Sequence, residues 1–470
     1  MIHTSTNLLQ KALALAIFTI ALPVITIAQW SAPIDLYPSA VSATTNESMG
    51  TCIGTSGDTV HVVWSDQTKK NKIGTIYYSH SVDTGSTWSA PVALSTVNKF
   101  ALNPAIAING RNVHVVWREI DSITGHRASW YKHSLDGGKT WGPAVFIDST
   151  ADWPAVSVSG KTVYIANDRI VTTSPYNTEI FFLRSTDNGA TWGAATRLSF
   201  AVGRSEDEAI YAEGAHVHMS WNDNRTGKFK IFYKESADFG VTWDPDVALD
   251  SAYDYSTMVY STGAHADVVA AGIPKGGHYQ ILLSQSADTG ATWSSGTNVS
   301  NDTAHAYFYP DMVRDGSDIH ITYSGNGGGW YLHSADGGTT WDPAYFIGAG
   351  GSDFVAYTGC ALHVIYINAN HLYYIRNLKG NTGSSCSKPL GIEQPNGNMA
   401  STIVYPNPAK NNITIRSNAE LGLITIYNLL GETVYTEQTD AAEKQVDISK
   451  LPAGVYILHT RNTFMKVIKE

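Results

Sequence analysis

Cysteine and charge are both scarce in this sequence. The 470 residues include three cysteines, and charged residues make up 15% of the chain. Three cysteines are too few for a disulfide framework. We expect at most one pair, and favour Cys360 with Cys386 because both flank the last predicted strands of the main domain. The net charge of −10 argues against nucleic acid or an anionic membrane surface as a partner.

Long hydrophobic runs are also rare. One stands out, Ala12–Ala28, which follows Lys11 and ends in the small-residue site Thr26-Ile27-Ala28. This pattern predicts a cleaved secretory signal peptide over residues 1–28. No other stretch is long and apolar enough to cross a bilayer, so we expect no membrane span after the signal is removed.

Aromatic residues, by contrast, are plentiful at 11%, with 25 tyrosines and 13 tryptophans, which favours strands over helices. The motif Ser-x-Asp-x-Gly-x-Thr-Trp occurs six times, about every 50 residues. Its aspartates are Asp83, Asp136, Asp187, Asp238, Asp288 and Asp336. A fixed period of this size indicates one supersecondary unit that is repeated and packs on its neighbours.

Each copy of the motif lies between two short strands, so it is predicted to be a hairpin turn. The aspartate can accept hydrogen bonds from backbone N–H groups two residues on, glycine allows a positive φ, and tryptophan supplies an apolar anchor. The six aspartates are therefore expected to be structural. A shared metal site is disfavoured because they occupy equivalent turns far apart in the sequence.

The repeat predicts four short strands per unit, the signature of a propeller blade. Pairs of first and second strands occur seven times, and the seventh unit ends without the motif. Trp30–Leu36 closely copies Trp88–Leu94, a fourth strand. We therefore predict an all-β, seven-bladed β-propeller over residues 29–378. Its N-terminal strand should pair with His371–Ile375, closing the ring and leaving no open sheet edge.

The motif resembles the Asp box, or BNR repeat, of the sialidase-like β-propellers, and we use the name Asp box below. The resemblance implies the propeller fold. It implies function less narrowly, because Asp boxes occur in sialidases, other glycosidases, sorting receptors and assembly factors. Two hypotheses follow: a surface propeller that binds extracellular glycan or a surface protein without catalysis, and a glycoside hydrolase acting on extracellular polysaccharide.

The C-terminal part has a different composition. Residues 379–400 are rich in Gly, Asn, Ser and Pro and predict a linker, and residues 401–470 predict a small Ig-like β-sandwich. Tyr405-Pro-Asn-Pro408, Asp447-Ile-Ser-Lys-Leu-Pro-Ala-Gly-Val-Tyr-Ile457 and the basic tail Lys466–Lys469 resemble the C-terminal sorting domain of the type IX secretion system. The resemblance implies that 401–470 engages that machinery and that the protein is released or held at the outer cell surface. The alternative is a carbohydrate-binding sandwich.

Ligands of propellers usually bind on the face opposite the Asp boxes, formed by the loops between second and third strands and the connections between units. We call this the loop face. Aromatic, carboxylate and arginine side chains there suit sugars. The candidate ligand-binding residues are Asp66, Arg118, Trp153, Arg169, Asp223, Arg225, Tyr255, Tyr307 and Tyr309. The candidate catalytic carboxylates are Glu119, Asp168 and Glu206.

Structural roles compete with these assignments. Asp168 with Arg169 and Asp223 with Arg225 recur at one place in adjacent units, so they can equally be inter-blade ion pairs. The three tyrosines can equally be core residues. Histidines also recur at one second-strand position and are expected to be packing residues: His61, His114, His218 and His320. We expect no metal and no cofactor.

A sialidase activity is not expected. The sialidase resemblance would require an arginine ahead of the first Asp box, and none occurs before Arg111. An arginine triad could still come from residues that no motif selects: Arg118, Arg169, Arg204, Arg225 or Arg314. Sialidases also have six blades, whereas the strand count here is seven.

Overall fold

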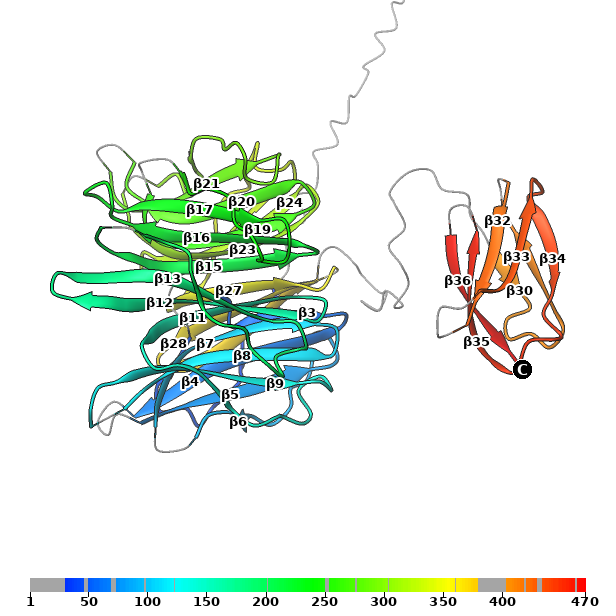
Figure 1. The fold of residues 1–470 in the computed structure, drawn as a ribbon, viewed down its shortest axis with the longest axis horizontal. Coiled ribbons are helices and arrows are strands. Elements are labelled where there is room, and N and C mark those ends of the chain that lie inside the picture. Colours follow the sequence, from blue (N-terminus) through cyan, green and yellow to red (C-terminus); the bar gives the residue numbers. More distant parts are fainter. Residues whose placement is uncertain are drawn as a thin grey trace, which may run out of the picture. The chain divides into compact units, whose positions relative to one another are not determined.

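A computed structural model describes residues 30–45, 50–68, 73–96, 99–121, 123–200, 202–249, 253–274, 277–302, 304–359, 361–378, 403–417, 420–428, 433–460 and 463–470. Across these ranges every helix or strand element is a strand (Figure 1), which confirms the all-β prediction. The chain forms two compact units, residues 1–386 and 387–470. The predicted signal peptide, the linker, Cys360 and Cys386 lie outside the described residues.

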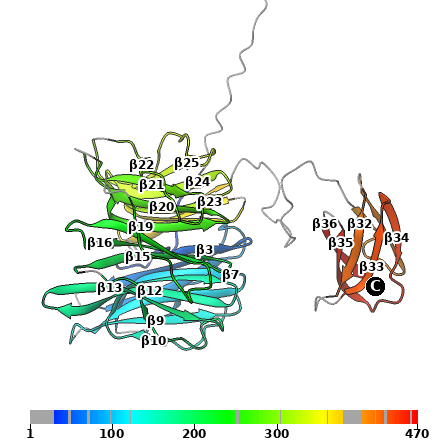
Figure 2. The same ribbon diagram turned by 45° about the horizontal axis from the view of Figure 1, so that its top comes forward.

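Four sheets of the larger unit each hold four consecutive antiparallel strands, the arrangement of propeller blades. Their strands are β11 (Ala151–Ser159), β12 (Thr162–Thr173), β13 (Tyr176–Ser185) and β14 (Thr196–Arg197); β15 (Ser205–Glu213), β16 (His216–Asp223), β17 (Lys230–Ser236) and β18 (Val247–Ala248); β19 (Tyr253–Thr262), β20 (His265–Gly272), β21 (Gln280–Ser286) and β22 (Thr297–Asn298); β23 (Tyr307–Asp315), β24 (Asp318–Gly325), β25 (Gly328–Ser334) and β26 (Tyr345–Ala349). Figure 2 shows these sheets following one another in chain order.

A nine-stranded sheet precedes them. It contains two meanders of the same kind, joined by one parallel bridge between Gly74 and Phe100. The meanders are β3 (Ile53–Ser56), β4 (Thr59–Thr68), β5 (Ile73–Ser81) and β6 (Val92–Ala93), and β7 (Phe100–Asn109), β8 (Asn112–Ile120), β9 (Arg127–Ser134) and β10 (Val145–Asp148). The short β2 (Ala43–Thr44) also pairs with β4.

The last sheet of this unit joins the first strand of the unit to its last three. It holds β27 (Gly351–Tyr357), β28 (Ala361–Asn368), β29 (His371–Leu378) and the N-terminal β1 (Ile34–Asp35). Ile34 pairs with Tyr374, and a further bridge joins Trp30 to Asn377. The predicted pairing of the N-terminal strand with His371–Ile375 is therefore confirmed.

The six Asp boxes are turns held by their own side chains, as predicted. In the first box, Asp83 Oδ1 accepts the N–H groups of Ser86 at 3.1 Å and Thr87 at 2.8 Å. The donors thus lie three and four residues on, not two as expected. Ser81 Oγ donates to the same carboxylate at 2.7 Å and accepts the Gly85 N–H at 2.8 Å. The other five boxes repeat the hydrogen bonds from the serine hydroxyl and the threonine N–H, so these carboxylates have a structural role.

The tryptophan of an Asp box packs on a neighbouring four-stranded meander. Trp141 packs edge-on against Tyr78 at 4.9 Å between ring centroids, and Tyr78 in turn contacts the Nδ1 of His61 at 2.6 Å. The same arrangement recurs in other sheets, with His114 and Tyr131, His218 and Tyr233, and His363 and Tyr374. The predicted packing role of the second-strand histidines is confirmed for these contacts.

The smaller unit has two sheets. One holds β30 (Ile403–Tyr405), β31 (Asn412–Arg416) and β34 (Glu443–Asp447), and the other β33 (Thr433–Thr439), β32 (Gly422–Tyr427), β35 (Gly454–Thr460) and β36 (Thr463–Lys469). Buried aliphatic side chains including Ile413, Ile424 and Leu458 form its own core. In the described part of either unit, no helix could span a bilayer.

Candidate functional site

A group of acidic side chains is buried on the loop face, where β11 and β12 lie next to β15. We call Asp152, Asp168, Asp207 and Glu208 the acidic cluster. Asp152 and Asp168 are direct cross-strand partners, and both are buried, as is Glu208. Like charges directly opposite each other destabilise a sheet, so this placement is costly unless some of these groups are neutral.

Burial raises the pKa of Asp168 well above its usual value, and the charges of Asp152, Asp207 and Glu206 raise it further. Burial, followed by the charge of Asp168, likewise raises the pKa of Glu208. For Asp207, burial and the charge of Glu206 raise the pKa to about 6. Burial therefore favours the protonated form of Asp168 and Glu208 compared with an exposed carboxyl group.

Glu208 is placed by a bulge that recurs in the first strands. Register shifts and positive φ angles occur at Asn103, Trp153, Asp207 and Tyr309. The next residue is proline in three cases, Pro104, Pro154 and Pro310, but in β15 it is Glu208. Neither carboxyl oxygen of Glu208 has a hydrogen-bond partner among the described residues. An acid thus occupies a slot that three other first strands fill with a prolyl ring, while β27 has Asp353 at the corresponding place.

Arginine and aromatic side chains cover this cluster. Asp152 forms ion pairs with both Arg118 and Arg127, and the Arg118 guanidinium lies 4.6 Å from the centre of the Trp153 ring. Glu206 pairs with Arg204. Partly exposed side chains therefore surround the buried acids.

Tyr176 completes this surface. Burial raises its pKa, the charges of Asp168 and Glu206 raise it slightly further, and those of Arg127 and Arg204 lower it. The ring is nevertheless 46% exposed. It lies at the end of the β12–β13 hairpin, whose strands are the longest of their sheet and project beyond their neighbours in Figure 1. We call Arg127, Trp153, Tyr176, Arg204, Glu206 and Asp207 the loop-face patch.

Four of the predicted residues thus meet here: Arg118, Trp153, Asp168 and Glu206. Glu119 does not join them in this way. It accepts a hydrogen bond from Trp117 Nε1 at 3.1 Å, and burial raises its pKa. Asp66 instead accepts the backbone N–H groups of Val41 and Ser42 at 2.9 and 2.8 Å, which is a structural role.

The two predicted inter-blade ion pairs differ from expectation in their partners. Arg169 pairs with Asp148 of the preceding sheet at 3.1 Å, and not with Asp168. Arg225 pairs with Asp223 and Asp246, both at 2.6 Å and both in its own sheet. Asp223 and Arg225 therefore stabilise a loop within one sheet.

The three tyrosines predicted to be ligand platforms differ in their burial. Tyr307 is 3% exposed and donates to Asp302 at 2.7 Å, so it is a core residue and not an exposed platform. Tyr309 lies at the positive-φ bulge of β23 and is half-buried. The side chain of Tyr255 is not among those that the structure describes.

Sequence reasoning passed over Asp152, Arg127, Tyr176, Asp207 and Glu208 as site residues. The run Glu206-Asp207-Glu208 was a usable signal, since three consecutive acids at the start of a strand must place one of them inward. The exposed end of the β12–β13 hairpin carried no such signal.

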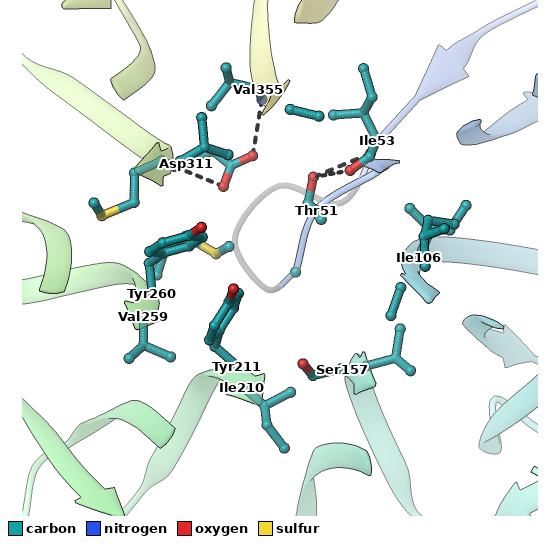
Figure 3. Close-up of a pocket in the computed structure, with 18 of the residues that line it drawn as sticks. Thr51, Ile53, Ile106, Ser157, Ile210, Tyr211, Val259, Tyr260, Asp311 and Val355 are labelled. Atoms are coloured by element: carbon teal, nitrogen blue, oxygen red, sulfur yellow. Dashed lines mark hydrogen bonds between the residues drawn. The ribbon is translucent and has the colours of Figure 1, made fainter. Parts of the chain in front are cut away.

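A central cavity of about 300 Å³ is a second hollow in the larger unit. First strands from around the unit line it, namely β3, β7, β11, β15, β19, β23 and β27, and Figure 3 shows their side chains facing one space. Burial raises the pKa of Asp311, its carboxyl group, to about 7. Both oxygens of Asp311 accept backbone N–H groups, from Met312 at 2.9 Å and Val355 at 3.1 Å (Figure 3). The rest of the lining combines aliphatic side chains with polar ones, among them Thr51, Ser157, Tyr260 and Arg314.

Comparison with protein families gives two matches. Residues 26–321 match the BNR repeat-like domain, and residues 403–470 match the secretion system C-terminal sorting domain. No curated protein sequence is significantly similar to the chain.

Several solved structures are similar to the chain at low sequence identity. A polysaccharide lyase, the PL25 ulvan lyase, has a TM-score of 0.51 at 12% identity, over 71% of this chain and 93% of its own. A protein of unknown function from Dyadobacter fermentans DSM 18053 has a TM-score of 0.45 at 15% identity, over 59% and 94%. Trypanosoma rangeli sialidase has a TM-score of 0.43 at 14% identity, over 74% of this chain and 59% of its own.

Proposed function

Since the chain belongs to the BNR repeat-like domain family, we propose that it is an extracellular glycan-binding propeller that recognises its ligand through the loop-face patch. The observation that carries this proposal is the exposed Tyr176 at the end of the β12–β13 hairpin, where the charges of Asp168, Glu206, Arg127 and Arg204 act on its hydroxyl. Aromatic rings stack on the apolar faces of sugars, while Arg and carboxylate groups bind hydroxyls in directional pairs.

The C-terminal sorting domain directs export by the type IX secretion system, to the cell surface or outside. We further propose a signal peptide over residues 1–28, a propeller over 29–378, a linker over 379–400 and an Ig-like sorting domain over 401–470 that engages the secretion machinery. The two sheets of the smaller unit, with a common apolar core, support the sandwich.

We propose that the ring has seven blades. Seven first strands line the central cavity, and each begins a meander of four strands once β1 is counted with β27, β28 and β29. Closure by β1 supports the same count, because a ring without it would leave β29 as an open edge.

A second candidate function, cleavage of a polysaccharide, is favoured by the titration of the acidic cluster. Burial favours the protonated form of Asp168 and Glu208, the form that a general acid needs. Asp207, with a pKa of about 6, can act as a base at neutral pH. The ulvan lyase that shares the fold is by its name a polysaccharide lyase. This reading needs the buried acids to reach the substrate through movement of the patch.

Sialic acid is a poor match for this surface. A sialoside carboxylate requires arginines that are free to hold it. The candidate arginines already have carboxylate partners: Arg118 with Asp152, Arg169 with Asp148, Arg204 with Glu206, Arg225 with Asp223 and Arg314 with Asp267. We therefore expect a neutral, hydroxyl-rich ligand and no cleavage of sialosides.

The test is a glycan-array screen of the purified full chain, with product analysis of every hit. Tyr176→Ala should weaken binding about tenfold, the effect of about 1.4 kcal/mol from a lost aromatic contact. Phe239→Ala is the matched control, because Phe239 is 45% exposed in an Asp-box turn on the opposite face. Equal binding by the two variants would contradict the proposed surface. Turnover of a fluorogenic sialoside, abolished by Arg169→Ala or Arg225→Ala, would contradict the ligand class.

A further inference from the structure

The face that carries the Asp boxes holds a group of possible metal ligands in the β15–β18 sheet. His216 and His218 are two residues apart on β16, so they share one face of the strand. Glu235, on β17, is the cross-strand partner of His218. One ligand atom from each of the three lies within 4.8 Å of the others. Two imidazoles and a carboxylate are a donor set that suits zinc.

The hydrogen bonds of His218 decide which of its nitrogens is available. Tyr233 Oη donates its single proton to the backbone oxygen of Thr289 at 3.1 Å, because a carbonyl can only accept. Tyr233 must therefore accept at its 2.6 Å contact with His218 Nδ1. Nδ1 then carries the ring proton of a neutral imidazole, and Nε2 is left with a lone pair.

This lone pair has no protein partner. His218 is fully buried, and its Nε2 has no hydrogen-bond partner among the residues that the structure describes. A buried acceptor without a partner is costly. A fixed tautomer held by an outer hydroxyl is the arrangement found behind metal-binding histidines, where the outer partner orients the ring.

The other two ligands are already close together. His216 Nδ1 lies 2.5 Å from Glu235 Oε1, and the Glu235 side chain is 8% exposed while that of His216 is 40% exposed. The site is thus open to solvent at His216, while the other two ligands, His218 and Glu235, are buried. Two ligand atoms that each lie ~2.0–2.1 Å from a zinc ion are at most about 4 Å apart. The ligand atoms here lie within 4.8 Å of one another, so zinc binding requires side-chain movements of about 1 Å.

We propose that His216, His218 and Glu235 bind a zinc ion on the Asp-box face, with water in the open position. This assignment departs from the expectation that His218 is a packing residue only, and it is independent of the glycan-binding proposal on the opposite face. The ion would join β16 to β17 across their register and stabilise this sheet.

Other sheets show what the site needs. At the same positions, β8 and β9 carry Asn112, His114 and His133, a set without a carboxylate. In β24 and β25 the positions hold Asp318, His320 and His333, but His333 is engaged by two carboxylates, Asp318 at 3.5 Å and Asp342 at 2.8 Å. His133 is therefore a suitable control for loss of a histidine at an equivalent position.

The experiment uses the full chain without an affinity tag, loaded with Zn²⁺ and dialysed, with bound zinc counted by atomic spectroscopy. Co²⁺ loading gives a visible spectrum as an independent readout. His216→Ala and Glu235→Gln should each remove one bound zinc per chain and weaken the Co²⁺ absorption. They should also abolish a zinc-dependent rise in Tm of about 5 °C, as expected for a ligand that binds only the folded state.

His133→Ala should match the wild type in all three measurements. Circular dichroism checks the fold of each variant, and because His216 is partly exposed, His216→Ala is expected to fold. Tyr233→Phe should lower zinc affinity by about 10–100-fold through loss of the outer hydrogen bond. Equal zinc content in the wild type and His216→Ala would overturn the proposal, as would an equal loss in His133→Ala.

Discussion

Tyr374 and Trp88 pack edge-to-face with their ring centroids 4.8 Å apart, although Trp88 ends the first Asp box and Tyr374 lies in the last strand of the larger unit. The same contact type joins Tyr78 to Trp141, Tyr131 to Trp192 and Tyr233 to Trp293. The first and last sheets are therefore joined by the contact that joins consecutive ones.

Deletion of Trp30–Leu36 should destabilise the larger unit as a whole. It removes β1 from β29, exposes a strand edge, and deprives Tyr331 of the Trp30 ring, whose centroid lies 5.2 Å away. Chemical denaturation should show a lower midpoint for this variant than for a chain lacking residues 387–470. An unchanged midpoint would mean that closure by β1 contributes nothing.

A second prediction separates backbone strain from inter-sheet contact within one Asp box. Gly137 and Gly138 have φ of +80° and +84°, so alanine is strained at both. An added Cβ meets nothing at Gly137 but overlaps the Tyr78 hydroxyl at Gly138. Gly138→Ala should therefore lose about 1–3 kcal/mol more stability than Gly137→Ala in denaturant titrations. Equal losses would show that the tyrosine contact is easily relieved.

The Asp boxes should make stability fall in acid. Hydrogen bonds from Ser185 and Thr191 lower the pKa of Asp187 to about 2, below the unfolded value of about 3.9. A depressed folded pKa adds stability above pH ~4 that is lost as pH falls toward 2. Asp187→Asn should reduce stability at pH 7 and flatten its decline between pH 4 and pH 2. A decline as steep as that of the wild type would exclude this carboxylate as a cause.

The acidic cluster should have the opposite pH dependence. Burial raises the folded pKa of Glu208 above its unfolded value, so its contribution to stability is complete below pH ~4 and declines as pH rises. Glu208→Gln cannot ionise, and its Tm should exceed that of the wild type at pH 8 but not at pH 4.

Asp353 provides the control for this effect. Burial raises its pKa to about 8. Asp353 lies in β27 and accepts a hydrogen bond from Ser324 Oγ of β24, so neither residue belongs to the sheets of the acidic cluster. Asp353→Asn should also gain stability at high pH, yet leave glycan binding unchanged, whereas Glu208→Gln should alter binding. Equal glycan binding by both variants would show that the acidic cluster does not contribute to the proposed site.

Export should depend on the smaller unit. A chain ending at Ala400 retains all strands of the larger unit but lacks the sorting domain. In a host with a type IX system it should accumulate folded in the periplasm, as measured by fractionation and protease protection. Efficient surface display of the truncated chain would contradict the role of 401–470.

The repeat period made the sheets predictable, because Asp-box turns and strand alternation are local properties. The N-terminal strand was predictable for a different reason, the copying of Trp88–Leu94 in Trp30–Leu36. The partners and the burial of individual side chains were harder to predict. Arg169 pairs with Asp148 and Tyr307 is buried, and neither follows from spacing, since the direction of a side chain near a bulge depends on the neighbouring sheet. For Glu208 the sequence did offer a signal, the run of three acids from Glu206, but its burial beside Asp168 depends on the packing of β12 against β15.

Closure of the ring by β1 has a consequence for synthesis. Asp35 and His371 form a hydrogen bond across 336 residues of sequence. β1 can therefore pair only after β29, the last strand of the larger unit, has been synthesised. A chain that ends before β29 cannot acquire the closed ring, whereas a chain that ends after Leu378 can. Chains truncated within the larger unit should therefore unfold more readily, and be cleaved more readily by proteases, than chains that include β29.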